Sequence, residues 1–128
     1  MIIREVRASD AAVWRAMRCA LWPDGTEEHR VEIAAFLAGD AHEPCAVFVA
    51  EDESGLLVGV AELSIRNDVP GIAGKRTGYV EGLYVVPERR GRGIARKLLH
   101  AAKLWARENQ CEAFASDRAD RVIIDRRF

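Results

Sequence analysis

An arginine and glycine cluster, PERRGRGIARKLL at residues 87–99, carries the clearest chemical signal in the sequence. It separates a strand-like run from a helix-like run. The first amides of a helix have no internal partner, the helix dipole adds about half a positive charge there, and glycines let a ligand approach the backbone. The cluster therefore indicates an anion site that suits a phosphate group, while a solvated turn without a ligand stays open as the alternative.

Nucleic acid is a weaker ligand for this cluster. The 19 basic and 20 acidic residues leave a net charge of -1 and no basic surface that would hold a phosphate backbone. The cluster also lacks the GxxxxGK[ST] pattern of a nucleoside triphosphatase loop and offers no Ser or Thr to a magnesium ion. We expect no nucleic-acid partner. We expect no membrane partner either, because no run of about 18 apolar residues occurs.

The cysteines and histidines show no metal-binding pattern, so we expect no metal. The chain has three cysteines, Cys19, Cys45 and Cys111. We expect them to be reduced core thiols, and the protein to be cytoplasmic, since the N-terminus lacks an apolar signal region. We expect the three histidines to lie on the surface: His29, His42 and His100.

The elements that must hold the cluster alternate between strand and helix patterns over one domain, residues 1–128. Alternating and β-branched runs predict strands at residues 2–7, 45–51, 56–65, 77–86, 111–116 and 122–124. Apolar stripes with capping and stop signals predict helices from residue 9 or 10 to 22, from 26 to 39 and from 92 to 109. In the second helix we expect the buried residues to be Val31, Ile33, Ala34 and Leu37. This order indicates one α/β domain with a mixed sheet.

The cluster and the strand before it together resemble a known cofactor-binding element. RGRGIA at residues 90–95 fits the pattern R/Q-x-x-G-x-G/A, and the preceding strand contains Gly82, a residue that inside a strand marks a bulge or a close approach. This combination resembles the acetyl-coenzyme A binding element of the GCN5-related N-acetyltransferase superfamily. The resemblance implies a single acyl-CoA N-acyltransferase-like domain, in which a mixed, mainly antiparallel central sheet is flanked by helices and its bulged fourth strand exposes backbone groups.

The resemblance also implies which residues bind the cosubstrate, acetyl-CoA. On the strand, Leu83, Tyr84 and Val85 would line the acetyl-pantetheine arm. The backbone of the loop and helix start would cradle the diphosphate, through Arg90, Gly91, Arg92, Gly93, Ile94, Ala95 and Arg96. No cysteine falls on this unit. We therefore expect an amine to attack the thioester directly, without a covalent enzyme intermediate.

A closer resemblance extends over about residues 1–117. The segments VWRAMRCALWP, VAELSIRND, VEGLYVVPERRGRGIA, LWARENQC and FASD are similar to those of the aminoglycoside 6'-N-acetyltransferases of the type that dimerises. The resemblance implies a homodimer and a small-molecule amine acceptor, an aminoglycoside, contacted by Trp22, Glu81 and Asp117. Glu81 and Asp117 are then the candidate catalytic residues.

Acetyl transfer to an amine needs a neutral nucleophile. An alkyl ammonium with a pKa near 10 loses its proton at pH 7 at a cost of about 4 kcal/mol, so a base helps. Glu81 lies one residue before Gly82, on the strand that would deliver the thioester, and could take the proton directly or through water. A backbone N–H near Leu83 to Val85 could stabilise the developing oxyanion.

Further acidic residues suit a cationic acceptor. Asp24, Glu62 and Asp68 would add to the negative field around the acceptor.

The resemblance weakens near the C-terminus. Family members continue after ASD with a further helix and strands, whereas here ASDRAD leads at once to RVIIDRRF. We expect the family's C-terminal helix and a strand to be missing after about residue 120, on the acceptor side. Two other functions therefore stay open. One is an N-acetyltransferase for another amine, such as a polyamine, a small metabolite or a protein N-terminus; the other is a truncated, non-catalytic acetyl-CoA-binding domain.

Overall fold

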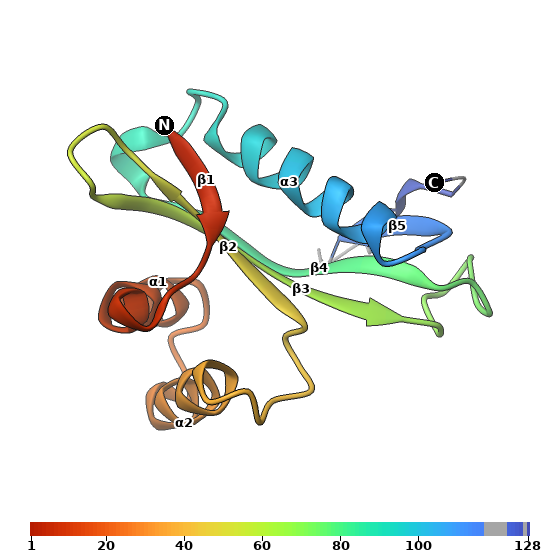
Figure 1. Cartoon of the computed structure of the whole chain (residues 1–128), viewed down its shortest axis with the longest axis horizontal. Coiled ribbons are helices and arrows are strands. Elements are labelled where there is room, and N and C mark those ends of the chain that lie inside the picture. Colours follow the sequence, from red (N-terminus) through yellow and green to blue (C-terminus); the bar gives the residue numbers. More distant parts are fainter. Residues whose placement is uncertain (117–122, 127) are drawn as a thin grey trace.

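The computed structural model describes residues 1–116, 123–126 and 128, which build one six-stranded sheet with helices on both faces (Figure 1). The strands are β1 (Ile2–Glu5), β2 (Ala46–Glu51), β3 (Leu57–Arg66), β4 (Thr77–Val85), β5 (Ala113–Ser116) and β6 (Ile123–Asp125). The α-helices are α1 (Ala11–Leu21), α2 (Thr26–Leu37) and α3 (Ile94–Glu108), and the short 3-10 helices are η1 (Ala8–Asp10) and η2 (Pro87–Arg89).

The strands lie in the sheet in chain order, from β1 to β6. Neighbouring strands pair antiparallel except β4 and β5, which are parallel and are connected through α3. A parallel pair needs such a crossover, because its two strands run in the same direction. The predicted α/β domain with a mixed, mainly antiparallel sheet is confirmed. Among the described helices, none has the length and apolar character needed to cross a membrane.

The predicted element ends lie close to the observed ones. Strand ends shift by at most two residues, and residue 122 of the predicted last strand lies outside the described ranges. Helix α3 begins at Ile94 rather than at residue 92, because Gly91 and Gly93 have φ angles of 78° and 81°. This left-handed conformation interrupts helical geometry, and glycine adopts it at little cost.

Two apolar layers hold the helices on the sheet, and Figure 1 shows α3 on one face with α1 and α2 on the other. The residues that α3 buries recur every four positions: Ile94, Leu98, Ala102 and Ala106. On the opposite face, Trp14 and Ile33 pack against the valines of β2. Because successive side chains of a strand point to opposite faces, the same central strands supply both layers.

The burial of α2 differs from the prediction. Ile33 is buried, as expected, but Leu37 is only half-buried, Val31 is 53% exposed and Ala34 is exposed as well. The helix packs mainly on α1 rather than on the sheet, so it buries only a narrow strip. His29 lies on that strip and is buried, so its predicted surface position is wrong.

The cysteines follow the prediction only in part. All three thiols are free; Cys111 is buried and Cys19 is half-buried. Burial raises the pKa of the Cys111 thiol, because the thiolate is poorly solvated there. Cys45 is exposed, so its predicted place in the core is wrong. Strand β2 begins one residue later, which leaves this side chain in the preceding connection.

Candidate active site

A β-bulge interrupts β4 at Glu81. On β3, Glu62 pairs with Gly82 and the next residue, Leu63, pairs with Val80, so Glu81 is the extra residue of the bulge. Such an extra residue bends the strand and redirects its own side chain. The bulged fourth strand that the family resemblance implied is therefore present.

The bulge coincides with the end of the β4–β5 pairing. Strand β5 pairs with β4 only over residues 77–80, so in the described sheet the β4 edge beyond residue 80 has no strand partner on that side. The N–H of Val86 donates to the carbonyl of Val58 on β3. Because hydrogen bonding alternates along an antiparallel strand, the N–H and C=O groups of Leu83 and Val85 point to the free edge.

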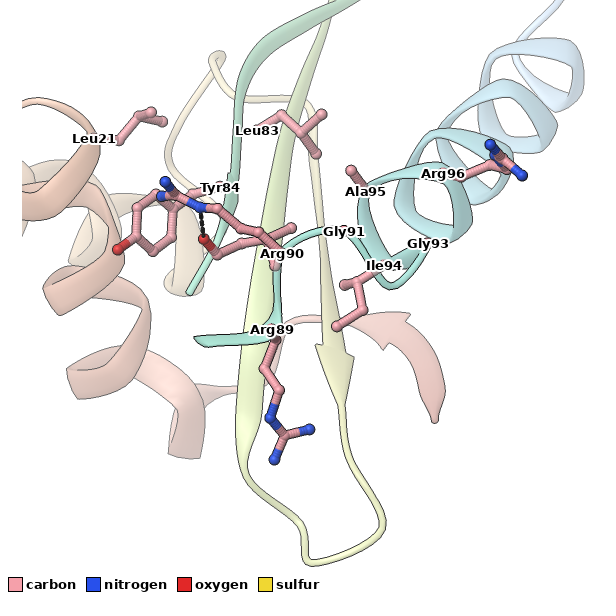
Figure 2. Close-up of a pocket in the computed structure, with 11 residues that line it drawn as sticks. Leu21, Leu83, Tyr84, Arg89, Arg90, Gly91, Gly93, Ile94, Ala95 and Arg96 are labelled. Carbon is pink, nitrogen blue, oxygen red and sulfur yellow. Dashed lines mark hydrogen bonds between the residues drawn. The ribbon is translucent and has the colours of Figure 1, made fainter. Parts of the chain in front are cut away.

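A pocket of about 440 Å³ opens beside this free edge (Figure 2). We refer to it as the larger pocket. Its lining residues are Leu21, Leu83, Tyr84, Val85, Arg89, Arg90, Gly91, Gly93, Ile94, Ala95 and Arg96. The structure thus brings together nine of the ten residues predicted to bind the cosubstrate; Arg92 is not among the lining residues. Leu21 and Arg89 line the pocket without having been predicted. Arg89 lies one residue before the RGRGIA motif, and Leu21 ends α1, far from the motif in the chain, so the motif pattern covers neither of them.

The start of α3 gives the larger pocket its anion-binding character. Ile94, Ala95 and Arg96 are the first residues of the helix and all three line the pocket. Their N–H groups lack partners within the helix, and the positive end of the helix dipole lies here. A helix start with these properties, next to a glycine loop, favours a phosphate group.

Two arginines fasten the loop before α3. Arg90 donates from Nε to the carbonyl of Val85 at 2.8 Å, and its guanidinium lies 5.4 Å from the centre of the Tyr84 ring. Figure 2 shows Arg90 turned toward Tyr84, while Arg89 extends the opposite way. Arg89 donates to Asp52 at 2.8 Å. Both side chains therefore bind the protein itself, in addition to contributing positive charge.

Asp52 anchors the β2–β3 turn to this loop. Its carboxylate accepts hydrogen bonds from the Ser54 hydroxyl, the Ser54 and Leu56 amides, and Arg89. These donors, the Ser54 hydroxyl foremost, lower the pKa of Asp52 to about 2. The carboxylate is therefore ionised over the whole physiological pH range.

Two smaller hollows continue from the larger pocket. The middle hollow, about 170 Å³, is lined by Leu21, Trp22, Val80, Glu81, Gly82, Leu83, Leu99, Ser116 and Ile124. The acidic hollow, about 230 Å³, is lined by Arg18, Trp22, Glu32, Glu43, Pro44, Glu62 and Glu81. The larger pocket shares Leu21 and Leu83 with the middle hollow, which in turn shares Trp22 and Glu81 with the acidic hollow. The three spaces thus adjoin one another across the bulge.

Glu81 is held in place by two residues of β3. Its carboxylate accepts a hydrogen bond from the Ser64 hydroxyl and two from Arg66, at 2.7 Å from Nε and 3.0 Å from Nη2. The Glu81 bonds raise the pKa of Arg66. A carboxylate has about four lone-pair sites, so about one remains open, on Oε1. Sequence reasoning missed Ser64 and Arg66, although their i, i+2 spacing places both on one face of β3.

Trp22 lies directly on Gly82. A Cβ atom built on Gly82 would be 2.5 Å from Cη2 of the Trp22 ring and 3.0 Å from a methyl of Leu21. Only a residue without a side chain fits under this ring. The glycine inside β4 therefore marks a close approach as well as a bulge, and the approaching group is a side chain.

A buried ion pair lies beside these residues. Arg18 donates from Nε and Nη2 to Glu62 at 2.7 and 2.9 Å, and Trp14 donates to the same carboxylate at 2.9 Å. Burial disfavours the charged form of Arg18, yet its hydrogen bonds to Glu62 and Glu32 hold its pKa above the ordinary value. Glu62, which was predicted to add to the negative field around the acceptor, lines the acidic hollow, but its carboxylate is buried and its charge is paired with Arg18.

The predicted residue Asp117 lies outside the described residues. Its neighbour Ser116 ends β5, is buried and lines the middle hollow. Among the residues that the structure describes, no group of three His, Cys, Asp or Glu side chains could hold a metal ion.

The acetyltransferase (GNAT) family matches residues 10–123 of the chain, which include the bulge, the glycine loop and every lining residue of the hollows except Ile124. The chain belongs to the GNAT acetyltransferase family. This GNAT chain is 45% identical over 117 residues to an aminoglycoside N(6')-acetyltransferase type 1 of Klebsiella aerogenes, covering 91% of this chain and 77% of that relative. It is 40% identical over 116 residues to an enzyme of the same name from Stenotrophomonas maltophilia, covering 90% and 73%.

Solved GNAT structures agree with these matches. The chain superposes with a TM-score of 0.81 and 32% identity on AAC(6')-Iy in complex with the bisubstrate analog CoA-S-monomethyl-acetylneamine, covering 92% of this chain and 79% of that one. The aminoglycoside 6'-N-acetyltransferase AAC(6')-Ih from Acinetobacter baumannii gives the same TM-score with 33% identity and the same coverage. The family resemblance of RGRGIA and its preceding strand is confirmed.

The Asp52 anchor yields a prediction about stability and pH. An Asp52→Asn variant should have a lower urea midpoint at pH 7, because it loses the charge that binds Arg89. A carboxylate whose folded pKa is lowered stabilises the fold above its unfolded pKa, 3.8 here, and loses this contribution as the pH falls toward about 2. The stability gap between wild type and variant should therefore be constant above about pH 5 and shrink below pH 4.

Urea unfolding followed by circular dichroism across this pH range measures the gap. Asp40→Asn, a change at an exposed aspartate, is the control and should leave stability nearly unchanged. A gap that keeps its full size down to pH 2 contradicts the assigned role of Asp52.

Proposed function

We propose that the chain transfers an acetyl group from acetyl-CoA to the 6'-amine of an aminoglycoside, by direct attack of the amine on the thioester. One observation carries the proposal: the larger pocket, with its free strand edge and helix start, adjoins the middle hollow, which shares Trp22 and Glu81 with the acidic hollow. Curated relatives that carry this activity in their names, at up to 45% identity, support the choice of acceptor.

The residues of the larger pocket fit acetyl-CoA. Leu83 offers its N–H and C=O groups on the free β4 edge and Val85 offers its N–H, while the Val85 carbonyl accepts from Arg90. Free groups of this kind match the amide groups of a pantetheine arm. The first amides of α3 and the charge of Arg96 favour the diphosphate. Bound acetyl-CoA supplies a thioester whose carbonyl an amine can attack. An N–H of Leu83 or Val85, both directed to the free edge, would stabilise negative charge on that oxygen.

The acidic hollow fits a polycationic acceptor. Glu32 and Glu43 are exposed, and Glu81 adds a third carboxylate that is partly exposed. Carboxylates gathered around a concave site raise the local concentration of cations. Trp22 supplies a flat apolar wall between this hollow and the middle one. Asp117, the other predicted contact, remains part of the proposal on the strength of the family resemblance.

Glu81 is the proposed proton acceptor. Ser64 and Arg66 fix its carboxylate, and the open lone pair on Oε1 can accept a hydrogen bond from the amine or from a water molecule. Removing a proton from an alkyl ammonium at pH 7 costs about 4 kcal/mol. A positioned base that shares this proton accelerates such reactions by about 10² to 10⁴ fold.

A free-thiol assay with acetyl-CoA tests the proposed function. We expect thiol release with aminoglycosides that carry a 6'-amine and none with matched compounds that carry a 6'-hydroxyl. Turnover of polyamines or peptides in place of aminoglycosides identifies an acetyltransferase for another amine. Calorimetric binding of acetyl-CoA without turnover of any acceptor identifies a non-catalytic binding domain.

The role of Glu81 yields a second prediction. Glu81→Gln keeps the volume and removes the proton acceptor, so kcat with an aminoglycoside should fall by about 10² to 10⁴ fold. The KM for acetyl-CoA should change less than twofold, because Glu81 does not line the larger pocket. Glu108→Gln, at the exposed end of α3, is the control. Steady-state kinetics measure these effects. A kcat of Glu81→Gln equal to that of the wild type would exclude this carboxylate as the base.

We also propose that the chain forms a homodimer in the cytoplasm. Strand β6 forms one edge of the described sheet, and Ile124 on it is 37% exposed. An edge strand with an apolar side chain favours pairing with another chain, which supports the dimer. The cytoplasmic location is supported by the free thiols, which suit a reducing compartment. Light scattering after size-exclusion chromatography should give twice the mass of one chain, and a monomer at all concentrations contradicts the dimer.

A further inference from the structure

His29 joins α2 to the carbonyl of Trp22. Its Nε2 lies 2.8 Å from that oxygen, and its Nδ1 lies 3.4 Å from Nη1 of Arg18. A guanidinium only donates hydrogen bonds, so in the neutral ring Nδ1 accepts and Nε2–H donates to Trp22. The proposed acetyl transfer makes no use of His29, although this side chain is only 6% exposed.

Trp22 depends on this contact because it lies at the end of α1. It is the residue after the helix, with φ of −131° and ψ of 87°, and its own N–H donates to the carbonyl of Arg18 at 2.7 Å. Carbonyl groups at a helix end lack partners within the helix. The ring nitrogen of His29 satisfies the Trp22 carbonyl, and so fixes the peptide from which the tryptophan side chain leaves the helix.

The Trp22 ring has contacts on two further sides. It covers Gly82 of β4, where even a Cβ atom would clash, and the Arg18 guanidinium lies 5.5 Å from its centre. Arg18 is in turn fixed by Glu62 of β3. The Trp22 ring therefore packs closely against the sheet in one position, and a shift of the Trp22 main chain would move the ring out of that position.

We propose that His29 is a positioning residue for the acceptor, because its hydrogen bond to the Trp22 carbonyl sets the Trp22 ring as the wall between the middle and acidic hollows. The kinetic consequence of this role rests on the proposed function. The role itself goes beyond the proposed function, because it assigns a task to a buried side chain that lines none of the three spaces. His29 and Glu32 occupy adjacent turns of α2, so the same helix also carries a carboxylate of the acidic hollow.

Two substitutions separate the hydrogen bond to Trp22 from packing, including the contact between the His29 and Trp22 rings, whose centres are 6.2 Å apart and which both variants lose. In His29→Gln the amide nitrogen can reach the place of Nε2 and still donate to the Trp22 carbonyl. In His29→Asn, one methylene shorter, the amide reaches only the place of Nδ1 and keeps at most the Arg18 contact. Both variants bury a neutral amide of similar polarity. His100→Asn, on the exposed side of α3, is the surface control.

Kinetics with an aminoglycoside provide the first measurement. We expect His29→Asn to raise the KM for the acceptor about tenfold, while His29→Gln stays within about threefold of wild type. The KM for acetyl-CoA should stay within twofold in both variants. In a Trp22→Ala background the difference between Asn and Gln at position 29 should vanish, since no ring remains to position. Equal effects of Asn and Gln, or an undiminished difference without the ring, would overturn the proposal.

Fluorine NMR provides a measurement that needs no substrate. The chain has three tryptophans, which 5-fluorotryptophan labels and single Trp→Phe variants assign. His29→Asn should shift or broaden the Trp22 signal, whereas His29→Gln should leave it near its wild-type position and Trp105 should stay unchanged in both. An unchanged Trp22 signal in His29→Asn overturns the proposal. If the wild type acetylates no aminoglycoside, the proposed function fails, and this spectrum still decides the role of His29.

Discussion

The bulge at Glu81 is the constraint on which the rest of the site depends. It adds one residue to β4 where β5 ends its pairing, so the strand continues along β3 while its other edge becomes free. Exposed backbone groups at a sheet edge need partners, and one of them, the Val85 carbonyl, receives Arg90 from the glycine loop. The free edge, the loop and the helix start thus form one unit. The bulge also turns Glu81 toward Ser64 and Arg66 and sets Gly82 beneath Trp22.

The buried pair of Arg18 and Glu62 contributes order more than stability. Desolvating two charges offsets most of their attraction, so such pairs are often replaceable by apolar residues without loss of stability, although removing one partner alone costs about 3 to 5 kcal/mol. Here the pair joins α1 to β3, and its remaining donors reach Glu32 and His29 of α2. An apolar cluster of equal volume would pack these elements, but it would not select one orientation for the end of α1.

Local sequence signals explain how much could be predicted. RGRGIA predicted the loop and the start of α3 because the signal lies within six consecutive residues, and its glycines have the positive φ angles that such a turn requires. Gly82 marked the neighbouring bulge because a glycine inside a strand-like run is also a local signal. The partners of Glu81 and Trp22 could not be predicted in this way. Ser64 and Arg66 lie 17 and 15 residues before Glu81, on another strand, and His29 lies on a different helix from the one that Trp22 follows.

The errors on α2 have a related cause. A periodic apolar stripe predicts a buried face, but it does not say how wide the covering surface is. Because α2 rests mainly on α1 and reaches the sheet through Ile33, Val31 remains exposed and the polar His29 takes a buried position. The bounds of α2 were therefore predicted closely, whereas the face of the helix that is buried was predicted incorrectly.

The seating of Trp22 on Gly82 limits how this pocket can change during evolution. With 2.5 Å between the ring and the place of a Cβ atom, position 82 cannot gain a side chain while position 22 keeps its indole. A smaller residue at position 22 would first have to open the space, and until position 82 changed as well it would leave a void beside Glu81. The two positions are thus expected to vary together among relatives. Adding a side chain at position 82 therefore requires a paired substitution at position 22, so a single mutation at position 82 is a poor route to a reshaped pocket.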